Sequence, residues 1–222
     1  MNYAALVTAI SDYTENTFPT TAMNTFITQA EQRIYNSVQF PSLRKNVTGT
    51  ITASNKYLSC PNDFLAPYSL AVFPYGGGDY IYLLNKDVNF MREAYPNPTS
   101  TGTPKYYALF GPTVASSAIS NELSFILGPT PSTTYSAELH YYYYPESITT
   151  ASSGQTWLGD NFDSVLLYGA LVEAYTYMKG EQDMMALYNQ KYSQALALAK
   201  RLGDGLERQD AYRSGQLRVE VS

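Results

Sequence analysis

His140 and Cys60 are the only histidine and cysteine of the chain, and both side chains could do chemistry. An imidazole can act as a general base, and a thiolate can act as a nucleophile or a metal ligand. His140 is surrounded by tyrosines, with no serine and glycine elbow nearby, and Cys60 lies in a Ser-Cys-Pro-Asn-Asp turn four residues after Lys56. Neither residue has the neighbours that such chemistry needs, so we interpret both as structural. One histidine and one cysteine also exclude a zinc cage and an internal disulfide.

Two pairs of carboxylates could seed a metal site or an acid–base pair, namely Asp160 with Asp163 and Glu181 with Asp183. Both pairs lie where helices are predicted to begin, and the helix dipole favours acidic side chains there. The glycine triplet 76–78 is followed by an aspartate and a strand, not by the lysine and helix of a phosphate-binding loop, which predicts a hairpin tip. We therefore expect no catalytic, cofactor-binding or metal-binding residue.

The overall charge argues against a protein that grips DNA. The 222 residues include 14 Lys and Arg against 19 Asp and Glu, for a net charge of −5. An acidic protein does not favour broad contact with a phosphate backbone. The chain also has 22 tyrosines, whose apolar ring and polar hydroxyl suit partly hydrated interfaces as well as cores.

No targeting or membrane segment is expected. The first residues, MNYAALVTAISDYTE, lack a basic flank and a long apolar run, so they do not predict a signal peptide. No stretch approaches the roughly 18 apolar residues that a membrane-spanning helix needs. The sequence predicts a soluble, intracellular protein without a membrane partner.

Helical periodicity marks both ends of the chain. Within residues 1–43, apolar residues at helical spacing predict a short first helix and a second helix over about 20–38, which begins after Pro19 and ends before Pro41. Within residues 148–203, the spacing predicts a third helix, with caps at Asp160 and Asn161 and an end at Gly180, and a fourth helix ending at Gly203. The last two helices should form an antiparallel hairpin.

Residues 44–147 have the texture of a β domain, with threonine-rich alternation and repeated Gly and Pro. The clearest strand is Tyr135–Tyr144, where Leu139 and Tyr141 fall on one face and Tyr142 and Tyr144 on the other. Between two predicted strands, Asp87–Tyr95 should form one or two helical turns, ended by Pro96 and Pro98. The predicted strands are Val47–Ala53, Ser69–Phe73, Tyr80–Leu84, Tyr106–Phe110, Leu123–Leu127 and Tyr135–Tyr144.

These patterns predict an α+β fold. A four-helix bundle of the N- and C-terminal helices (1–43 and 148–203) would carry an inserted antiparallel β domain (44–147) and an extended C-terminal arm (204–222). The arm is rich in charge and poor in apolar surface, so it is either ordered by a partner or an ordinary frayed terminus.

Five segments keep the order and spacing of a known family over most of the chain. The longest, Thr156–Lys179, reads TWLGDNFDSVLLYGALVEAYTYMK. The shorter segments are AEQRIY at 30–35, PNDFL at 61–65, GTPKYY at 102–107 and YNQKY at 188–192. Together these segments resemble the head-to-tail adaptor proteins of tailed bacteriophages, especially short-tailed ones. Cys60 departs from the family pattern, which has an aliphatic residue before the proline.

The resemblance implies a non-enzymatic, structural ring of twelve copies in the virion, at the head–tail junction, made in the host bacterial cytoplasm. The ring would lie between the portal protein above and the tail nozzle or tube protein below, and DNA would pass through its channel without sequence-specific binding. The C-terminal arm would dock on the portal. The expected portal-binding residues are Arg208, Tyr212, Arg213, Leu217, Arg218, Val219 and Val221.

The strand pattern and the tyrosine content predict contacts between subunits of the ring, with many tyrosines buried only on assembly. Two other functions stay open: a tail-tube or completion subunit, and a glycan-binding module, because exposed aromatic rings also stack on sugars. The expected intersubunit residues are Tyr142, Tyr144, Tyr168 and Tyr175.

Overall fold

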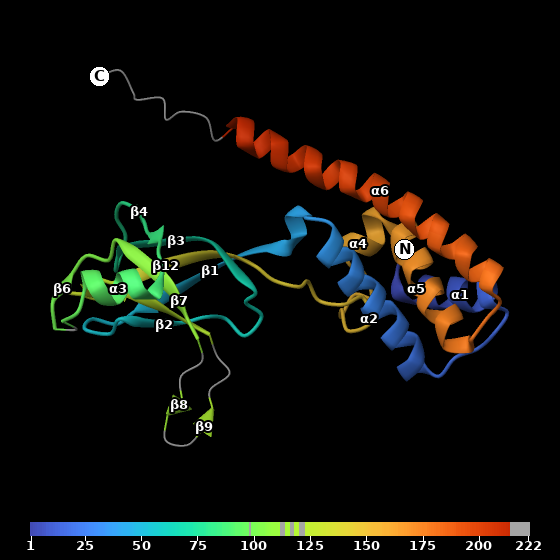
Figure 1. The fold of residues 1–222 in the computed structure, drawn as a ribbon, viewed down its shortest axis with the longest axis horizontal. Helices are drawn as coiled ribbons and strands as arrows, with labels where there is room; N and C mark the ends of the chain where they lie inside the picture. The colour runs from blue at the N-terminus through green and yellow to red at the C-terminus, as the bar shows by residue number, and fades with distance from the viewer. Residues whose placement is uncertain (98, 112–113, 116–117, 120–122, 214–222) are drawn as a thin grey trace. The chain divides into compact units, whose positions relative to one another are not determined.

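The chain folds into two compact units, one helical and one built on β-sheets. A computed structural model describes residues 1–97, 99–111, 114–115, 118–119 and 123–213. Residues 44–143 form the β unit, and residues 1–43 join the chain from Tyr144 onward in the helical unit. Figure 1 shows the elements of each unit. The mixed α+β class is as predicted, but the described residues form six helices rather than four.

The first two helices form as the sequence predicts. Asn2 caps α1, because its side chain accepts a hydrogen bond of 2.9 Å from the Ala5 backbone N–H. α2 follows Pro19, and its buried stripe includes Phe26, Ile27 and Ile34. The helices of this unit are α1 (Tyr3–Thr14), α2 (Thr20–Ser37), α4 (Trp157–Asn161), α5 (Asp163–Met178) and α6 (Gln182–Arg213).

The predicted caps of the third helix are wrong. Asp160 and Asn161 lie inside the short helix α4, because Thr156 caps that helix by accepting a hydrogen bond from the Gly159 N–H. The backbone then breaks at Phe162, and α5 begins without a side-chain cap. α5 ends near Gly180 as predicted, but Lys179 adopts the left-handed conformation there. Gly180 is needed because a Cβ would lie 2.6 Å from the ring of Tyr175.

The predicted end of the last helix at Gly203 is also wrong, because α6 continues to Arg213. A glycine inside a helix costs only about 1 kcal/mol, and the residues that follow include strong helix formers such as Leu206 and Glu207. Residues 204–213 are therefore helical and not an extended arm. The rest of the predicted arm, 214–222, lies outside the described residues.

α5 is the central helix of its unit and contacts α1, α2, α4 and α6. Small residues allow this close packing: a Cβ added at Gly169 would lie 3.1 Å from the Ala30 Cβ and 3.2 Å from the ring of Tyr192. α6 has 32 residues and α5 has 16, so at about 1.5 Å per residue α6 is about twice as long. Much of α6 therefore has no α5 surface to pack against.

Glu31 is a buried carboxyl group within the helical unit. It is 2% exposed, and its Oε1 accepts a hydrogen bond of 2.9 Å from the Ile148 N–H, which ties α2 to the chain segment after the β unit. Burial raises the pKa of Glu31 above its ordinary value, although the hydrogen bonds from Ile148 and Ser147 oppose the shift. The ionised form is therefore less favourable in the folded chain than in the unfolded chain.

We expect a pH dependence of stability from this group. Between its ordinary pKa of 4.5 and the raised value, the folded chain binds more protons at Glu31, so the free energy of unfolding falls as pH rises through this window. Glu31→Gln keeps an acceptor for the Ile148 N–H without a charge. The stability of this variant, measured by thermal unfolding, should lack the part of the pH dependence that Glu31 contributes. At pH 8 the variant should be no less stable than the wild type. The exposed control Glu181→Gln should keep the pH dependence of the wild type.

The β unit contains two four-stranded sheets. The first has the order β1-β12-β3-β4 with antiparallel pairing, and the second has the order β2-β10-β7-β5. An antiparallel β domain was predicted, but the second sheet is mixed, because β5 pairs with β7 in parallel. The first sheet comprises β1 (Arg44–Ile51), β12 (Tyr135–Tyr142), β3 (Ala66–Pro74) and β4 (Ile81–Tyr82), and the second comprises β2 (Tyr57–Ser59), β10 (Ser124–Gly128), β7 (Tyr106–Phe110) and β5 (Leu84–Asn85).

Smaller elements complete the β unit. The helix α3 packs against β7 and β10, where turns over 87–95 were predicted. The predicted strand Tyr80–Leu84 is divided between the two sheets, because Leu83 turns into the core between β4 and β5. The remaining elements are α3 (Val88–Ala94), β6 (Thr101–Gly102) paired in parallel with β11 (Thr130–Pro131), β8 (Val114–Ala115) paired with β9 (Ala118–Ile119), and the 3-10 turn η1 (Pro41–Leu43).

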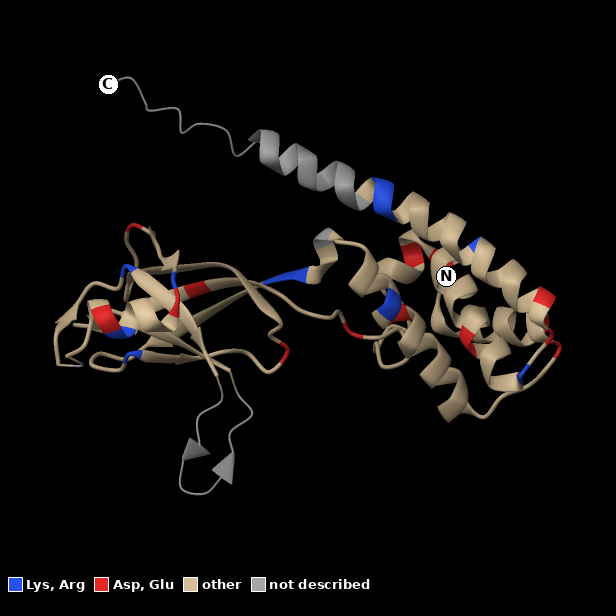
Figure 2. Cartoon of the chain, in the orientation of Figure 1, with Lys and Arg blue, Asp and Glu red and all other residues tan. Residues whose placement is uncertain are grey.

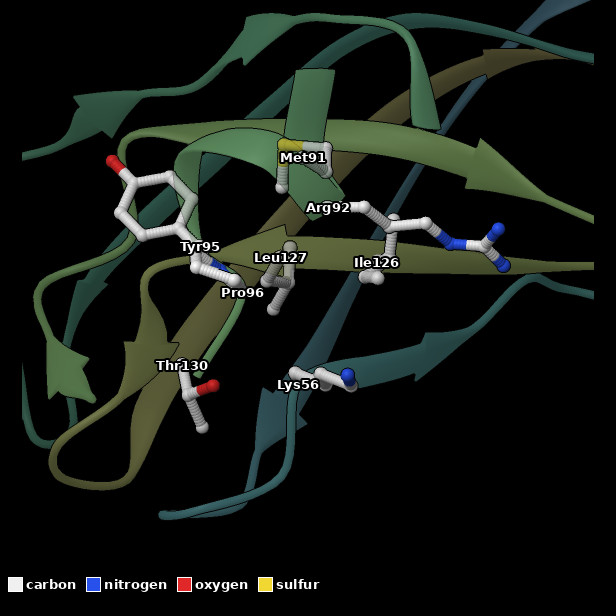
Figure 3. A pocket seen from close by; sticks show the side chains of 8 residues that line it. All are labelled: Lys56, Met91, Arg92, Tyr95, Pro96, Ile126, Leu127 and Thr130. Carbon is white, nitrogen blue, oxygen red and sulfur yellow. The ribbon is translucent and has the colours of Figure 1, made fainter. Parts of the chain in front are cut away.

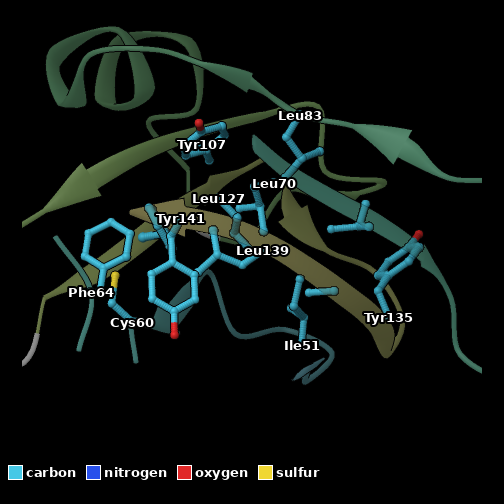
Figure 4. Close-up of a cluster of buried hydrophobic side chains, with 13 residues drawn as sticks. Ile51, Cys60, Phe64, Leu70, Leu83, Tyr107, Leu127, Tyr135, Leu139 and Tyr141 are labelled. Atoms are coloured by element: carbon cyan, nitrogen blue, oxygen red, sulfur yellow. The ribbon is translucent and has the colours of Figure 1, made fainter. Parts of the chain in front are cut away.

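The core of the β unit is rich in aromatic side chains. The Phe125 ring is fully buried and meets the rings of Phe64 and Tyr107 edge to face, at centroid distances of 5.4 and 5.5 Å. Figure 4 shows this cluster, which draws on both sheets. β12 supplies every second residue to it, as the predicted alternation requires. The two sheets therefore enclose one core.

Candidate interaction surfaces

The structure does not bring His140 or Cys60 into a reactive arrangement. His140 lies on the solvent-facing side of β12, with its Nε2 at 3.9 Å from Glu138 Oε1. Cys60 is 7% exposed, and burial raises the pKa of its thiol to about 12. The thiol therefore stays protonated near neutral pH, where it is a poor nucleophile.

Acidic residues of both pairs lie in the first turns of helices, and the glycine triplet lies in a turn between strands. Asp163 lies in the first turn of α5, and Asp183, in the first turn of α6, accepts a hydrogen bond of 2.8 Å from the Met184 N–H. The glycines 76–78 have positive φ and form the predicted turn between β3 and β4. Over the described part of the chain, no three His, Cys, Asp or Glu side chains group closely enough to hold a metal ion.

A pocket of about 200 Å³ lies where α3 meets β10. Figure 3 shows Met91 and Ile126 beside it, with the cationic side chains of Lys56 and Arg92 extending nearby. Both cations face aromatic rings, Lys56 that of Tyr57 and Arg92 that of Phe110. Among the described lining residues there is no carboxylate, histidine or cysteine, so those residues provide no acid–base pair.

The two predicted intersubunit tyrosines near the end of β12 lie in different units. Tyr142 is half-buried on the outer face of the first sheet, where its ring meets the Tyr68 ring at 6.0 Å and the Arg44 guanidinium at 5.6 Å. Tyr144 belongs to the helical unit, is 39% exposed, and donates a hydrogen bond to Asn36 Oδ1. Both rings keep surface that a neighbour could cover.

The two predicted intersubunit tyrosines of α5 are half-buried against α6. The Tyr188 ring of α6 lies 6.5 Å from Tyr168 and 4.9 Å from Tyr175. Burial raises the pKa of Tyr188 to about 12, so this tyrosine stays protonated across the physiological range. Tyr168 and Tyr175 thus pack within the chain, and a contact with another subunit stays a prediction for them.

The predicted portal-binding residues divide into two sets. Arg208, Tyr212 and Arg213 belong to the last turns of α6, which the sequence placed in an extended segment. The others, Leu217, Arg218, Val219 and Val221, lie outside the described residues. The structure therefore gives a helical scaffold to the first set.

Two apolar surfaces were not predicted from the sequence. On α6, Leu187, Leu198 and Leu202, which we call the α6 stripe, are 42, 64 and 46% exposed. The second surface is an edge of the β unit, which we call the ridge: Tyr80, Ile81, Tyr82 and Leu84 are 37 to 69% exposed. Among the residues that Figure 2 colours by charge, Lys, Arg, Asp and Glu are few on both units. The ridge residues are neighbours in the chain, whereas Leu187 and Leu198 lie about three turns apart on α6. Exposed apolar patches mark sites of protein contact.

The protein has a mixed α and β architecture. The ridge and the α6 stripe are exposed apolar surfaces suited to association with other proteins. The family model described as SU10 adaptor protein matches residues 1–220. The chain therefore belongs to the SU10 adaptor protein family, whose members are structural adaptors of bacteriophages. No curated protein matches the chain. The described helices include none that is long and apolar enough to cross a membrane.

Proposed function

We propose that the chain is a ring-forming head-to-tail adaptor that joins the phage portal to the tail and surrounds the path of the DNA. The family match over residues 1–220 carries this proposal. The exposed leucines of α6 and the exposed ridge of the β unit support it, since a ring subunit must present two flanks to its neighbours. The ring has twelve copies and belongs to a short-tailed phage.

The position in the virion follows from the same proposal. The ring lies at the head–tail junction, with the portal protein on one side and the tail nozzle or tube protein on the other. The net charge of −5 suits a channel through which DNA moves without being held, because like charges repel. Tyr142, Tyr144, Tyr168 and Tyr175 lie at or near the contacts between neighbouring subunits.

The C-terminal end of α6 and the residues after it bind the portal in this proposal. Arg208, Tyr212 and Arg213 would be presented by the helix, and Leu217, Arg218, Val219 and Val221 would follow it. An aromatic ring and arginines are side chains that contribute strongly to protein interfaces. The helix would also set the distance between the portal contact and the rest of the subunit.

Truncation separates the two parts of this contact. Chains that end at residue 213 or at residue 203 are compared with the full chain for binding to the portal ring by sedimentation. We expect each deletion to weaken binding, and the longer one by at least about tenfold. Arg208→Ala with Arg213→Ala should also weaken binding, whereas Lys200→Ala with Arg201→Ala, which removes the same charge from the same helix, should not. Unchanged binding by the chain that ends at 203 would exclude the portal contact proposed for this segment.

A further inference from the structure

The two long sides of the β unit carry different surfaces. On one side lie β1 and β2, which are edge strands of the two sheets, and on the opposite side lie β4 and β5. The first side contains an apolar groove and the second contains the ridge. The two surfaces therefore lie at opposite edges of a single compact unit.

The groove runs between β1 and β2 and has a volume of about 300 Å³. Val47, on β1, is 37% exposed beside it, and a Cβ added at Gly49 would have no atom within 4 Å. β1 is an eight-residue edge strand whose charged residues, Arg44 and Lys45, lie at its start, so residues 46–51 carry neither the charge nor the proline that usually protects an edge. The groove is lined by Val47, Thr48, Gly49, Leu58, Ser59, Cys60, Pro61, Ala137 and Leu139.

Contacts within the subunit fix the ridge in the absence of a partner. Leu83 is 6% exposed and anchors the segment in the core, while Tyr82 and Leu84 on either side are 69 and 60% exposed. The Tyr80 ring lies 4.5 Å from the Phe73 ring and its hydroxyl is hydrogen-bonded to Glu138. Such fixed aromatic side chains lose little conformational entropy on binding.

We propose that the ridge of one copy packs into the groove of the next copy around the ring. The occupant of the groove is a second copy because this chain carries an exposed apolar ridge on the opposite edge of the same unit. A contact between two different surfaces of the same chain is heterologous, and such contacts close into rings when the rotation between copies allows it. This inference rests on the proposed ring and assigns one of its contact surfaces.

Variants that block each surface test the contact in the full chain. Gly49→Leu adds a side chain at the groove, where a Cβ would have no atom within 4 Å, and Gly111→Leu, at a glycine whose Cβ would be equally free, is the control. Tyr82→Ser with Leu84→Ser removes the ridge from exposed positions. We expect the groove and ridge variants to need at least about tenfold higher concentration for assembly, measured by mass photometry with and without the portal ring. Gly111→Leu should assemble like the wild type.

A covalent trap tests the direction of the contact. In a Cys60→Ala background, a chain that carries both Val47→Cys and Leu84→Cys should give a ladder of disulfide-linked multimers under mild oxidation, whereas each single cysteine variant should not. Dimers without higher multimers, or groove and ridge variants that assemble like the wild type, would overturn the ridge and groove while leaving the ring in place. A wild-type chain that stays monomeric with and without the portal would overturn the ring itself.

Discussion

Phe125→Ala should lower the free energy of unfolding of the β unit by about 3–5 kcal/mol, the cost of deleting a buried aromatic ring from a packed core. The ring is fully buried on β10 and meets Phe64 and Tyr107 edge to face, so its removal leaves a cavity and ends both aromatic contacts. Urea unfolding followed by tyrosine fluorescence measures the loss.

The control for this variant is Tyr75→Ala. Tyr75 is also an aromatic residue of the β unit, but it is 70% exposed beside the turn after β3, so its removal should change stability by no more than about 0.5 kcal/mol. Equal losses in the two variants would show that Phe125 does not belong to the core.

Leu166→Ala should lower the free energy of unfolding of the helical unit by about 2–5 kcal/mol. Leu166 is fully buried on α5, the helix that contacts α1, α2, α4 and α6, so the cavity would open where several helices meet. Helix propensity does not offset the loss, because alanine gains only a few tenths of a kcal/mol over leucine. Thermal unfolding followed by circular dichroism at a helical wavelength measures this change.

Leu198→Ala on α6 makes the same substitution at a residue that is 64% exposed. In the isolated subunit it should change stability by no more than about 0.5 kcal/mol. A loss close to that of Leu166→Ala would mean that the α6 stripe is buried in the monomer and is not available to a partner.

The sequence predicts the elements whose signal is local. β12 shows the strict alternation of buried and half-buried residues that its period-two pattern predicts, since each residue faces the side opposite to its neighbour. α2 begins directly after Pro19, as the proline predicts, and it ends at Ser37, before the stop expected at Pro41. These signals depend on the chain within a few residues, and tertiary packing does not overrule them.

The errors arise where a local signal competes with another. Gly203 resembles a helix end, but glycine ends a helix only when the left-handed conformation gains more than continued helical hydrogen bonding, and here the helix continues. Asp160 and Asn161 resemble caps, but Thr156 starts a helix earlier. In both cases the residue type occurs at a helix end and also within a helix, and the surrounding residues determine which of these positions it takes.

The candidate interaction surfaces depend on strand order, which no local pattern supplies. The segment Tyr80–Leu84 reads as a strand, but only the sheet order makes it an edge with exposed rings. Val47 and Leu58 line one groove because β1 and β2 are edges of different sheets on the same side of the unit. The periodicity of a strand predicts which face of the sheet each residue lies on, but it does not predict which element packs against that face.

Image classification of the purified chain, alone and mixed with its portal ring, distinguishes a head-to-tail adaptor from a tail-tube or completion subunit. We expect closed rings of the chain seated coaxially on the portal, with the β units of neighbouring copies in contact. Particles in which the chain leaves the portal bare, and instead forms rings that stack on one another, would contradict the adaptor function and favour a tail-tube or completion subunit.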